Sequence, residues 1–131
     1  MAAVLLDTTV VIDLLRGRHG AITSLRALRE AGDSVYVCAI TVEETVRGLR
    51  SGEDERVRGL FAGLRPAVLA DEEGWQAGAW RRRYAERGQT LSQADCLIAA
   101  AALSVRARLA TGNPRDFPME ELAVDYWPAG E

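Results

Sequence analysis

The sequence contains no lysine, and this absence excludes several kinds of chemistry. All sixteen basic residues of the 131-residue chain are arginine. A phosphate-binding P-loop requires a lysine, and Schiff-base catalysis requires a lysine amine, so neither fits this chain. The net charge of −3 also argues against a large, non-specific nucleic-acid footprint. A small site that reaches phosphates through bound metal ions remains compatible with this composition.

Histidine, cysteine and long apolar runs are equally scarce. The single histidine, His19, cannot form a histidine-rich metal site and is expected on the surface. The two cysteines, Cys38 and Cys96, lie in apolar segments and are expected to be reduced core residues of a cytoplasmic protein. No apolar stretch reaches the roughly 20 residues that a membrane helix needs, and the N-terminus has no signal-peptide pattern. We therefore expect a cytoplasmic protein without a membrane segment.

The hydrophobic pattern alternates between short strands and amphipathic helices. With 48% apolar and 27% charged residues, the composition is that of a folded protein, and we expect one domain over residues 1–131. The alternation predicts an α/β fold with three layers, α/β/α, around a central, mostly parallel sheet. The predicted strands are 4–6, 34–40, 67–69, 109–111 and 123–127, and the predicted helices are 10–15, 21–31, 41–49, 53–64, 71–87 and 92–105.

Polar residues, most of them acidic, follow the predicted strands or open the buried helices. In open parallel sheets, ligands bind beyond the carboxyl ends of the strands, so these positions are candidate site residues. They are Asp7, Thr41, Glu43, Glu44, Asp95, Asn113 and Asp116.

Helix capping is a competing interpretation of the same residues. A hydroxyl or amide side chain followed three residues later by an acid is the spacing of a capping box. An acid near a helix N-terminus stabilises the helix by roughly 0.3–1 kcal/mol, so for any single acid capping and function stay open. The three pairs with this spacing are Thr41 and Glu44, Ser92 and Asp95, and Asn113 and Asp116.

Taken together, the acids favour a metal site. Carboxylates that converge on one edge of a sheet repel one another, and a divalent cation among them removes that repulsion. Oxygen ligands select hard ions, so Mg²⁺ or Mn²⁺ is the expected metal. Such an ion can generate a nucleophile from water and stabilise the leaving oxygen of a phosphodiester.

Four segments also carry a family resemblance: "LLDTTVVIDLL" at 5–15, "ITVEETVRG" at 40–48, "LSQADCLIAAAAL" at 91–103 and "LATGNPRDF" at 109–117. In this order and spacing they resemble the four motifs of the PIN domain, and most of all those of small VapC-type toxins of bacterial toxin–antitoxin pairs. The resemblance covers nearly the whole chain. It implies a metal-dependent endoribonuclease that hydrolyses RNA with carboxylate-bound Mg²⁺ or Mn²⁺. It also implies a homodimeric toxin held inactive by a cognate, VapB-like antitoxin.

The resemblance assigns three acids directly. The first catalytic and metal-binding acid of the family falls on Asp7 and the third on Asp95. The second stands three residues after a threonine and four before a glycine, so Thr41 and Gly48 place it at Glu44.

The fourth acid is where the sequence departs from the family pattern. Many members have an acid two residues after the threonine that corresponds to Thr111, and this chain has Asn113 there. The resemblance therefore assigns the fourth role to Asp116, and whether Asp116 or Asn113 completes the site stays open. Thr9 and Thr111 match hydroxyl residues that orient the first acids in the family.

Two alternative functions are considered. Aspartyl-phosphate phosphatases and receiver domains use a lysine, which the chain lacks, and a haloacid-dehalogenase-like enzyme needs an acid where Thr9 stands. The other alternative is a catalytically silent PIN domain that binds a protein partner, and Asn113 is the feature that favours it.

Aromatic and basic residues outside the motifs have other expected roles. Trp75, Trp80 and Tyr84 are expected in the core or in a dimer contact. Arg47 and Arg50 are candidates for contact with an RNA substrate.

Overall fold

The computed structural model describes residues 2–130, and within this range the chain forms one parallel sheet flanked by helices. The strands are β1 (Ala3–Leu6), β2 (Ser34–Cys38), β3 (Arg65–Ala67), β4 (Arg108–Thr111) and β5 (Val124–Tyr126). The helices are α1 (Thr8–Leu15), α2 (His19–Glu30), α3 (Ala39–Arg47), α4 (Asp54–Ala62), α5 (Asp71–Ala85), α6 (Gln93–Ser104) and the 3-10 helix η1 (Pro114–Asp116).

The order of the strands places β1 at the centre of the sheet. The order is β3-β2-β1-β4-β5, and every neighbouring pair is parallel. From β1 the chain first builds outward through β2 and β3, and later through β4 and β5 on the other side. The strand order therefore reverses at β1, and such a switch point is where open α/β sheets bind ligands.

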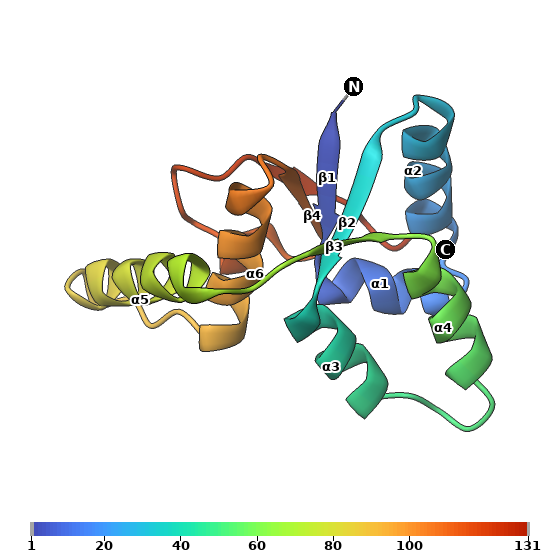
Figure 1. Ribbon diagram of the computed structural model, residues 1–131, viewed down its shortest axis with the longest axis horizontal. Helices are drawn as coiled ribbons and strands as arrows, with labels where there is room; N and C mark the ends of the chain where they lie inside the picture. The colour runs from blue at the N-terminus through green and yellow to red at the C-terminus, as the bar shows by residue number, and fades with distance from the viewer. Residues whose placement is uncertain (1, 131) are drawn as a thin grey trace.

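Side chains alternate between the two faces of the sheet, as the strand period requires. Leu5 packs in one core with helices α5 and α6, whereas Val4 and Leu6 pack in a second core with α1 and α2. Figure 1 shows these helices on opposite sides of the strands. The predicted three-layer arrangement with a parallel sheet is confirmed.

Helix α3 begins earlier than the sequence predicted, and the capping box predicted at its start is wrong. The residue before α3 is Cys38, and Thr41 lies fully buried inside the helix. Thr41 cannot cap the helix because its hydroxyl contacts Thr8 of α1 instead. At α6 the predicted cap is confirmed, since Asp95 N donates to Ser92 Oγ over 3.0 Å.

Strand β3 also differs, because it occupies Arg65–Ala67 rather than 67–69. The prediction ended the preceding helix at Leu64, took Pro66 as the residue that breaks it and placed the strand after the proline. In the structure Pro66 lies within the strand, and β3 is at the edge of the sheet. A proline is tolerated there because an edge strand does not need every backbone N–H for a neighbour.

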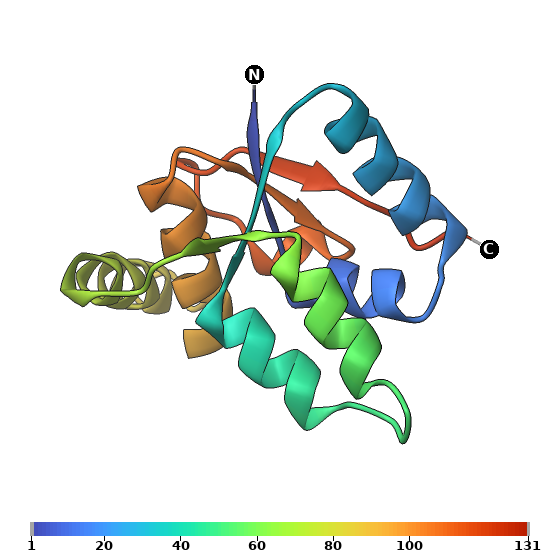
Figure 2. The same ribbon diagram turned by 45° about the vertical axis from the view of Figure 1, so that its right-hand side comes forward.

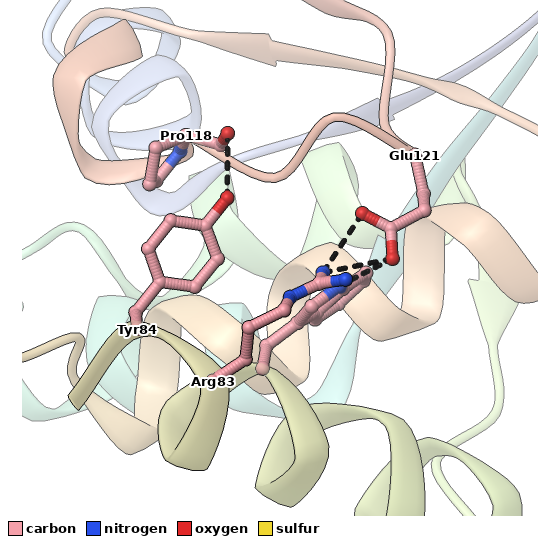
Figure 3. Close-up of polar contacts among 5 residues, drawn as sticks. Arg83, Tyr84, Pro118 and Glu121 are labelled. Atoms are coloured by element: carbon pink, nitrogen blue, oxygen red, sulfur yellow. Dashed lines mark hydrogen bonds and ion pairs between the residues drawn. The ribbon is translucent and has the colours of Figure 1, made fainter. Parts of the chain in front are cut away.

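Helix α5 is attached to the segment that follows η1, as Figure 3 shows. Tyr84 Oη donates to the carbonyl of Pro118 at 2.9 Å, and Arg83 Nη2 donates to both carboxylate oxygens of Glu121 at 2.8 and 2.9 Å. Trp80 is completely buried and donates to the same carboxylate. These contacts hold in place the segment that continues from η1.

The three aromatic residues of α5 do not share one environment. Trp80 and Tyr84 are buried, as predicted, but 82% of Trp75 is exposed. The prediction of a core position is wrong for Trp75, which lies on the exposed surface of α5 near Gly78. Its role in a dimer stays a prediction.

The C-terminal segment completes helix α2. The carbonyl of Ala129 accepts hydrogen bonds from Gly20 N at 2.7 Å and Ala21 N at 3.3 Å. Arg18, at the N-cap position, provides no side-chain bond, so the end of the chain satisfies these donors. Figure 2 shows the segment after β5 running to the start of α2. This long-range contact explains why the helix begins two residues before the predicted start.

Two further expectations can be compared with the structure. Cys38 and Cys96 are both buried free thiols. Across residues 2–130, none of the helices combines the length and the apolar character that a membrane crossing requires.

Candidate active site

The predicted site residues gather at the carboxyl edge of the sheet, around the switch point at β1. Figure 1 shows α1 and α3 starting at the lower ends of β1 and β2. Each predicted residue ends a strand, follows one, lies in the helix after it or opens a helix that packs on the sheet. In chain order they are Asp7, Thr9, Glu44, Asp95, Thr111, Asn113 and Asp116.

Asp7 is the most enclosed of these acids. Only 5% of the residue is exposed. Its Oδ1 accepts from the backbone N–H of Thr8 at 2.7 Å, and Asp7 is thereby the N-cap of α1. Its Oδ2 accepts from Thr111 Oγ1 at 2.7 Å and from Thr9 Oγ1 at 3.1 Å. Three donors therefore fix the orientation of the carboxylate.

Burial and hydrogen bonding act on Asp7 in opposite directions. Burial disfavours the charged form and raises the pKa of Asp7 above its usual value, and the charge of Glu44 raises it further. The hydrogen bonds from Thr111, Thr8 and Thr9 lower the pKa but do not cancel the effect of burial. The ionised form of Asp7 is thus less stable than that of an exposed aspartate.

The two hydroxyls that hold Asp7 also hold the loop after β4. Gly112 N donates to Thr9 Oγ1 at 2.9 Å, and Asn113 N donates to Thr111 Oγ1 at 3.0 Å. Each threonine therefore donates to Asp7 and accepts from the loop. The orientation of Asp7 is coupled in this way to the backbone that leads to Asp116.

Glu44 reaches the same edge from α3. Thr8 Oγ1 lies 2.7 Å from Glu44 Oε1 and 3.1 Å from Thr41 Oγ1. The neighbouring Glu43 is exposed and pairs with Arg47 at 3.1 Å, one helical turn further along. Of the two glutamates, Glu44 is therefore the one held against α1.

Asp95 lies in the first turn of α6 and is half-buried. Its pKa is raised to about 6, mainly by burial, while the hydrogen bond with Ser92 acts in the opposite direction. The charges of Asp116, Asp7 and Glu44 raise it further. The four predicted acids thus lie near enough to repel one another.

Asp116 and Asn113 lie together in the loop after β4. Asn113 Nδ2 donates to Asp116 Oδ2 at 2.9 Å, and Asn113 makes no side-chain bond that would cap η1. The capping interpretation of Asn113 is therefore wrong, because its amide orients Asp116 instead. Asp116 is half-buried, whereas Asn113 is exposed.

The donor set fits a hard divalent cation that keeps part of its water shell. Over residues 2–130, no three His, Cys, Asp or Glu side chains are already positioned to hold one metal ion together. Mg²⁺ needs no such cage, because it usually binds one or two carboxylates and retains several waters. Repulsion from the other three acids adds to the effect of burial on the pKa of Asp95, and a bound cation would relieve that repulsion.

One residue of this edge was missed in the sequence analysis. Thr8 donates through its backbone to Asp7 and through its hydroxyl to Glu44. The sequence shows Thr8 only as the neighbour of Asp7, and Glu44 is 36 positions away. No local pattern reports a contact of that separation.

Comparisons with known proteins point to one family. The model of the PIN domain family matches residues 4–122. Ribonuclease VapC19 of Mycobacterium tuberculosis is 31% identical over 115 residues, which cover 88% of this chain and 92% of that protein. Ribonuclease VapC10 of the same species is 32% identical over 118 residues, covering 90% and 88%.

Solved structures agree with this result. VapBC2 from Rickettsia felis, bound to a promoter DNA fragment, matches with a TM-score of 0.83 and 18% identity over 95% of this chain and 98% of that one. At this identity the likeness shows a shared fold. FitAB bound to the IR36 DNA fragment matches with a TM-score of 0.75 and 27% identity over 94% of each chain. From the family match, the identities and the fold, we conclude that the chain belongs to the PIN domain family.

Proposed function

We propose that this protein is a Mg²⁺- or Mn²⁺-dependent endoribonuclease and the toxin of a toxin–antitoxin pair. The family membership and the relatives named ribonuclease VapC support the reaction class. The observation that carries the proposal is the set of four acids, Asp7, Glu44, Asp95 and Asp116, gathered at the switch point of the sheet. Burial is the main cause of the raised pKa of Asp95, and the charges of Asp116, Asp7 and Glu44 raise it further.

The environment of each acid indicates the role that it would have in the reaction. Asp7 and Asp95 would bind the metal, Asp7 as a carboxylate already oriented by three donors. Glu44 and Asp116 would complete the set from α3 and η1. One of these carboxylates would accept a proton from the attacking water. The bound ion supplies an acidified water and stabilises charge on the leaving oxygen.

Cleavage of RNA by the purified protein tests this proposal. We expect cleavage of a structured RNA with Mg²⁺ or Mn²⁺ and none with a chelator. Asp7→Asn keeps the size of the side chain, but it removes the charge and replaces one acceptor oxygen with a donor NH2 group. It should abolish cleavage and leave the protein folded. Asp13→Asn, on the same helix α1, is the matched control and should cleave normally. Full activity in chelator, or in Asp7→Asn, would contradict the proposal.

The proposed partner is an antitoxin of the VapB type, because the structural neighbours include VapBC and FitAB complexes. An edge lined by four acids suits an arginine or lysine of the inhibitor, placed near Asp7 and Glu44. We also propose that the toxin is a homodimer that acts on RNA in the cytoplasm. Expression of the toxin alone should slow growth, and co-expression with the antitoxin should restore it. Normal growth during expression of active nuclease would contradict the toxin role.

A catalytically silent PIN domain that binds a protein partner is the second candidate. Two observations favour it: Asn113 replaces an acid, and residues 2–130 hold no ready-made group of three metal ligands. The two candidates differ in metal binding. A silent domain should bind neither Mg²⁺ nor Mn²⁺ at the acids, whereas the nuclease must.

A further inference from the structure

Thr8 connects two acids that come from different parts of the chain. Its backbone N–H donates to Asp7 Oδ1 at 2.7 Å, and its hydroxyl donates to Glu44 Oε1, also at 2.7 Å. We propose that Thr8 is a positioning residue that fixes Glu44 relative to Asp7, and that Thr41 supports it. This inference rests on the proposed function, because it assigns Thr8 a part in preparing the metal site.

The chemistry of the groups fixes the direction of the hydrogen bonds. A carboxylate can only accept, so the single hydroxyl proton of Thr8 goes to Glu44. The contact of 3.1 Å between the two threonine hydroxyls is then donated by Thr41. The resulting chain of donors runs from Thr41 to Thr8 to Glu44. Both donors are oriented, because β-branched side chains have few χ1 rotamers in a helix.

The location of these residues explains why such a connection is needed. Thr8 is the first residue of α1, which follows β1, while Thr41 and Glu44 lie one turn apart on α3, which follows β2. Without a side-chain contact, Glu44 on α3 would sample several rotamers relative to Asp7. Holding Glu44 Oε1 in advance reduces the entropy lost when the carboxylate binds an ion.

The two oxygens of Glu44 differ as a result. Oε1 is occupied by Thr8, and within residues 2–130 no protein donor reaches Oε2. Oε2 is therefore the oxygen available for an ion or for a metal-bound water. Hydrogen bonds of this kind to a ligand carboxylate typically change metal affinity or activity by roughly 10- to 100-fold when removed.

The second threonine of α3, Thr45, provides the matched control. Thr45 lies one turn beyond Thr41 and is 2% exposed, but its hydroxyl has no hydrogen-bond partner among the described residues. Thr45→Val removes a buried hydroxyl from the same helix without removing a bond. Because that hydroxyl is already unsatisfied, its replacement by a methyl group should not destabilise the protein.

The test is the affinity of the metal-free protein for Mn²⁺, measured by calorimetry, together with RNA cleavage. Thr8→Val keeps the shape and the backbone donor to Asp7, and we expect affinity and cleavage to fall roughly 10- to 100-fold. Thr8→Ser keeps the hydroxyl and should recover most of both. Thr45→Val should match the wild-type protein. Wild-type affinity in Thr8→Val, or equal losses in Thr8→Val and Thr8→Ser, would overturn the proposal.

A double-mutant cycle with Glu44→Gln separates positioning from a general structural effect. If Thr8 acts through Glu44, Thr8→Val should cause little further loss of Mn²⁺ affinity in the Glu44→Gln protein. An equally large further loss would overturn the proposed role. A failure of the proposed function would give a different result. If the wild-type protein binds Mn²⁺ but cleaves no RNA, the nuclease function is contradicted. The Mn²⁺ affinities of the variants would still decide whether Thr8 positions Glu44.

Discussion

Thr111 Oγ1 lies 2.7 Å from Asp7 Oδ2, and this hydrogen bond joins the carboxyl ends of two neighbouring strands, β1 and β4. Both residues are buried. Burial raises the pKa of Asp7, and among the hydrogen bonds that lower it the one from Thr111 has the largest effect.

Removal of this donor should destabilise the protein. In Thr111→Val, Asp7 loses its shortest side-chain hydrogen bond, so we expect a loss of about 1–3 kcal/mol in the free energy of unfolding. The pKa of Asp7 should rise further, and the loss should therefore be larger at neutral pH than in acid, where Asp7 is protonated. Urea denaturation in chelator, at neutral and at acidic pH, measures the loss of stability and its dependence on pH. Thr111→Ser should stay close to wild type, and a loss of equal size in both variants would contradict the role of the hydroxyl.

The fold was predictable from the sequence where local patterns decide it. Short apolar runs predicted the positions of β1, β2 and β4, and Ser92 as the N-cap residue predicted the start of α6. The misplaced elements depend on long-range contacts: α3 starts before Thr41 because Thr41 faces α1, and α2 starts before residue 21 because the C-terminal segment supplies a carbonyl. The acids at the strand ends could be found from their positions, but the Thr8 contact could not, because it forms only once β1 and β2 pair.

The ionisation of Asp95 should reduce stability as the pH rises. The pKa of Asp95 is raised from 3.8 to about 6 in the folded protein, so the unfolded chain releases this proton more readily. The ionisation of Asp95 therefore lowers the free energy of unfolding. This loss is absent below the pKa of Asp95 in the unfolded chain, grows as the pH rises and is complete above about pH 6. In chelator, Asp95→Asn should therefore raise the melting temperature at about pH 7.5, with a difference that shrinks toward about pH 4. A variant that is less stable than wild type at neutral pH would contradict this cause.

Asp116 should contribute to metal binding although it lies three residues beyond Asn113. Asn113 orients its carboxylate through a hydrogen bond of 2.9 Å, and its charge acts on Asp95. Asp116→Asn should lower Mn²⁺ affinity or cleavage by roughly 10- to 100-fold, with little change in melting temperature. Normal cleavage at limiting metal would leave a site of three acids, Asp7, Glu44 and Asp95.

Gly20 should be intolerant of any side chain. An added Cβ would lie 2.6 Å from the carbonyl oxygen of Pro128 and 2.7 Å from that of Ala129. Because these atoms are backbone, Gly20→Ala should destabilise the protein by about 1–3 kcal/mol. Gly59 in α4 is the control, since a Cβ there meets no atom within 4 Å apart from the adjacent residues and the helix's own backbone. Gly59→Ala should stabilise the helix by about 0.5–1 kcal/mol, and thermal unfolding of both variants would show whether the C-terminal segment is packed as described.

The central claim is that the acids at the switch point bind the metal, and the melting of metal-free protein titrated with Mn²⁺ tests it most directly. At a Mn²⁺ concentration of about 100 times Kd, the free energy of unfolding should increase by about 2.7 kcal/mol. The wild-type protein and the Asp13→Asn control should both show this increase. The double variant Asp7→Asn, Asp95→Asn should not, because both carboxylates have lost their charge. An equal increase in the double variant would mean that the ion binds elsewhere and would contradict the account.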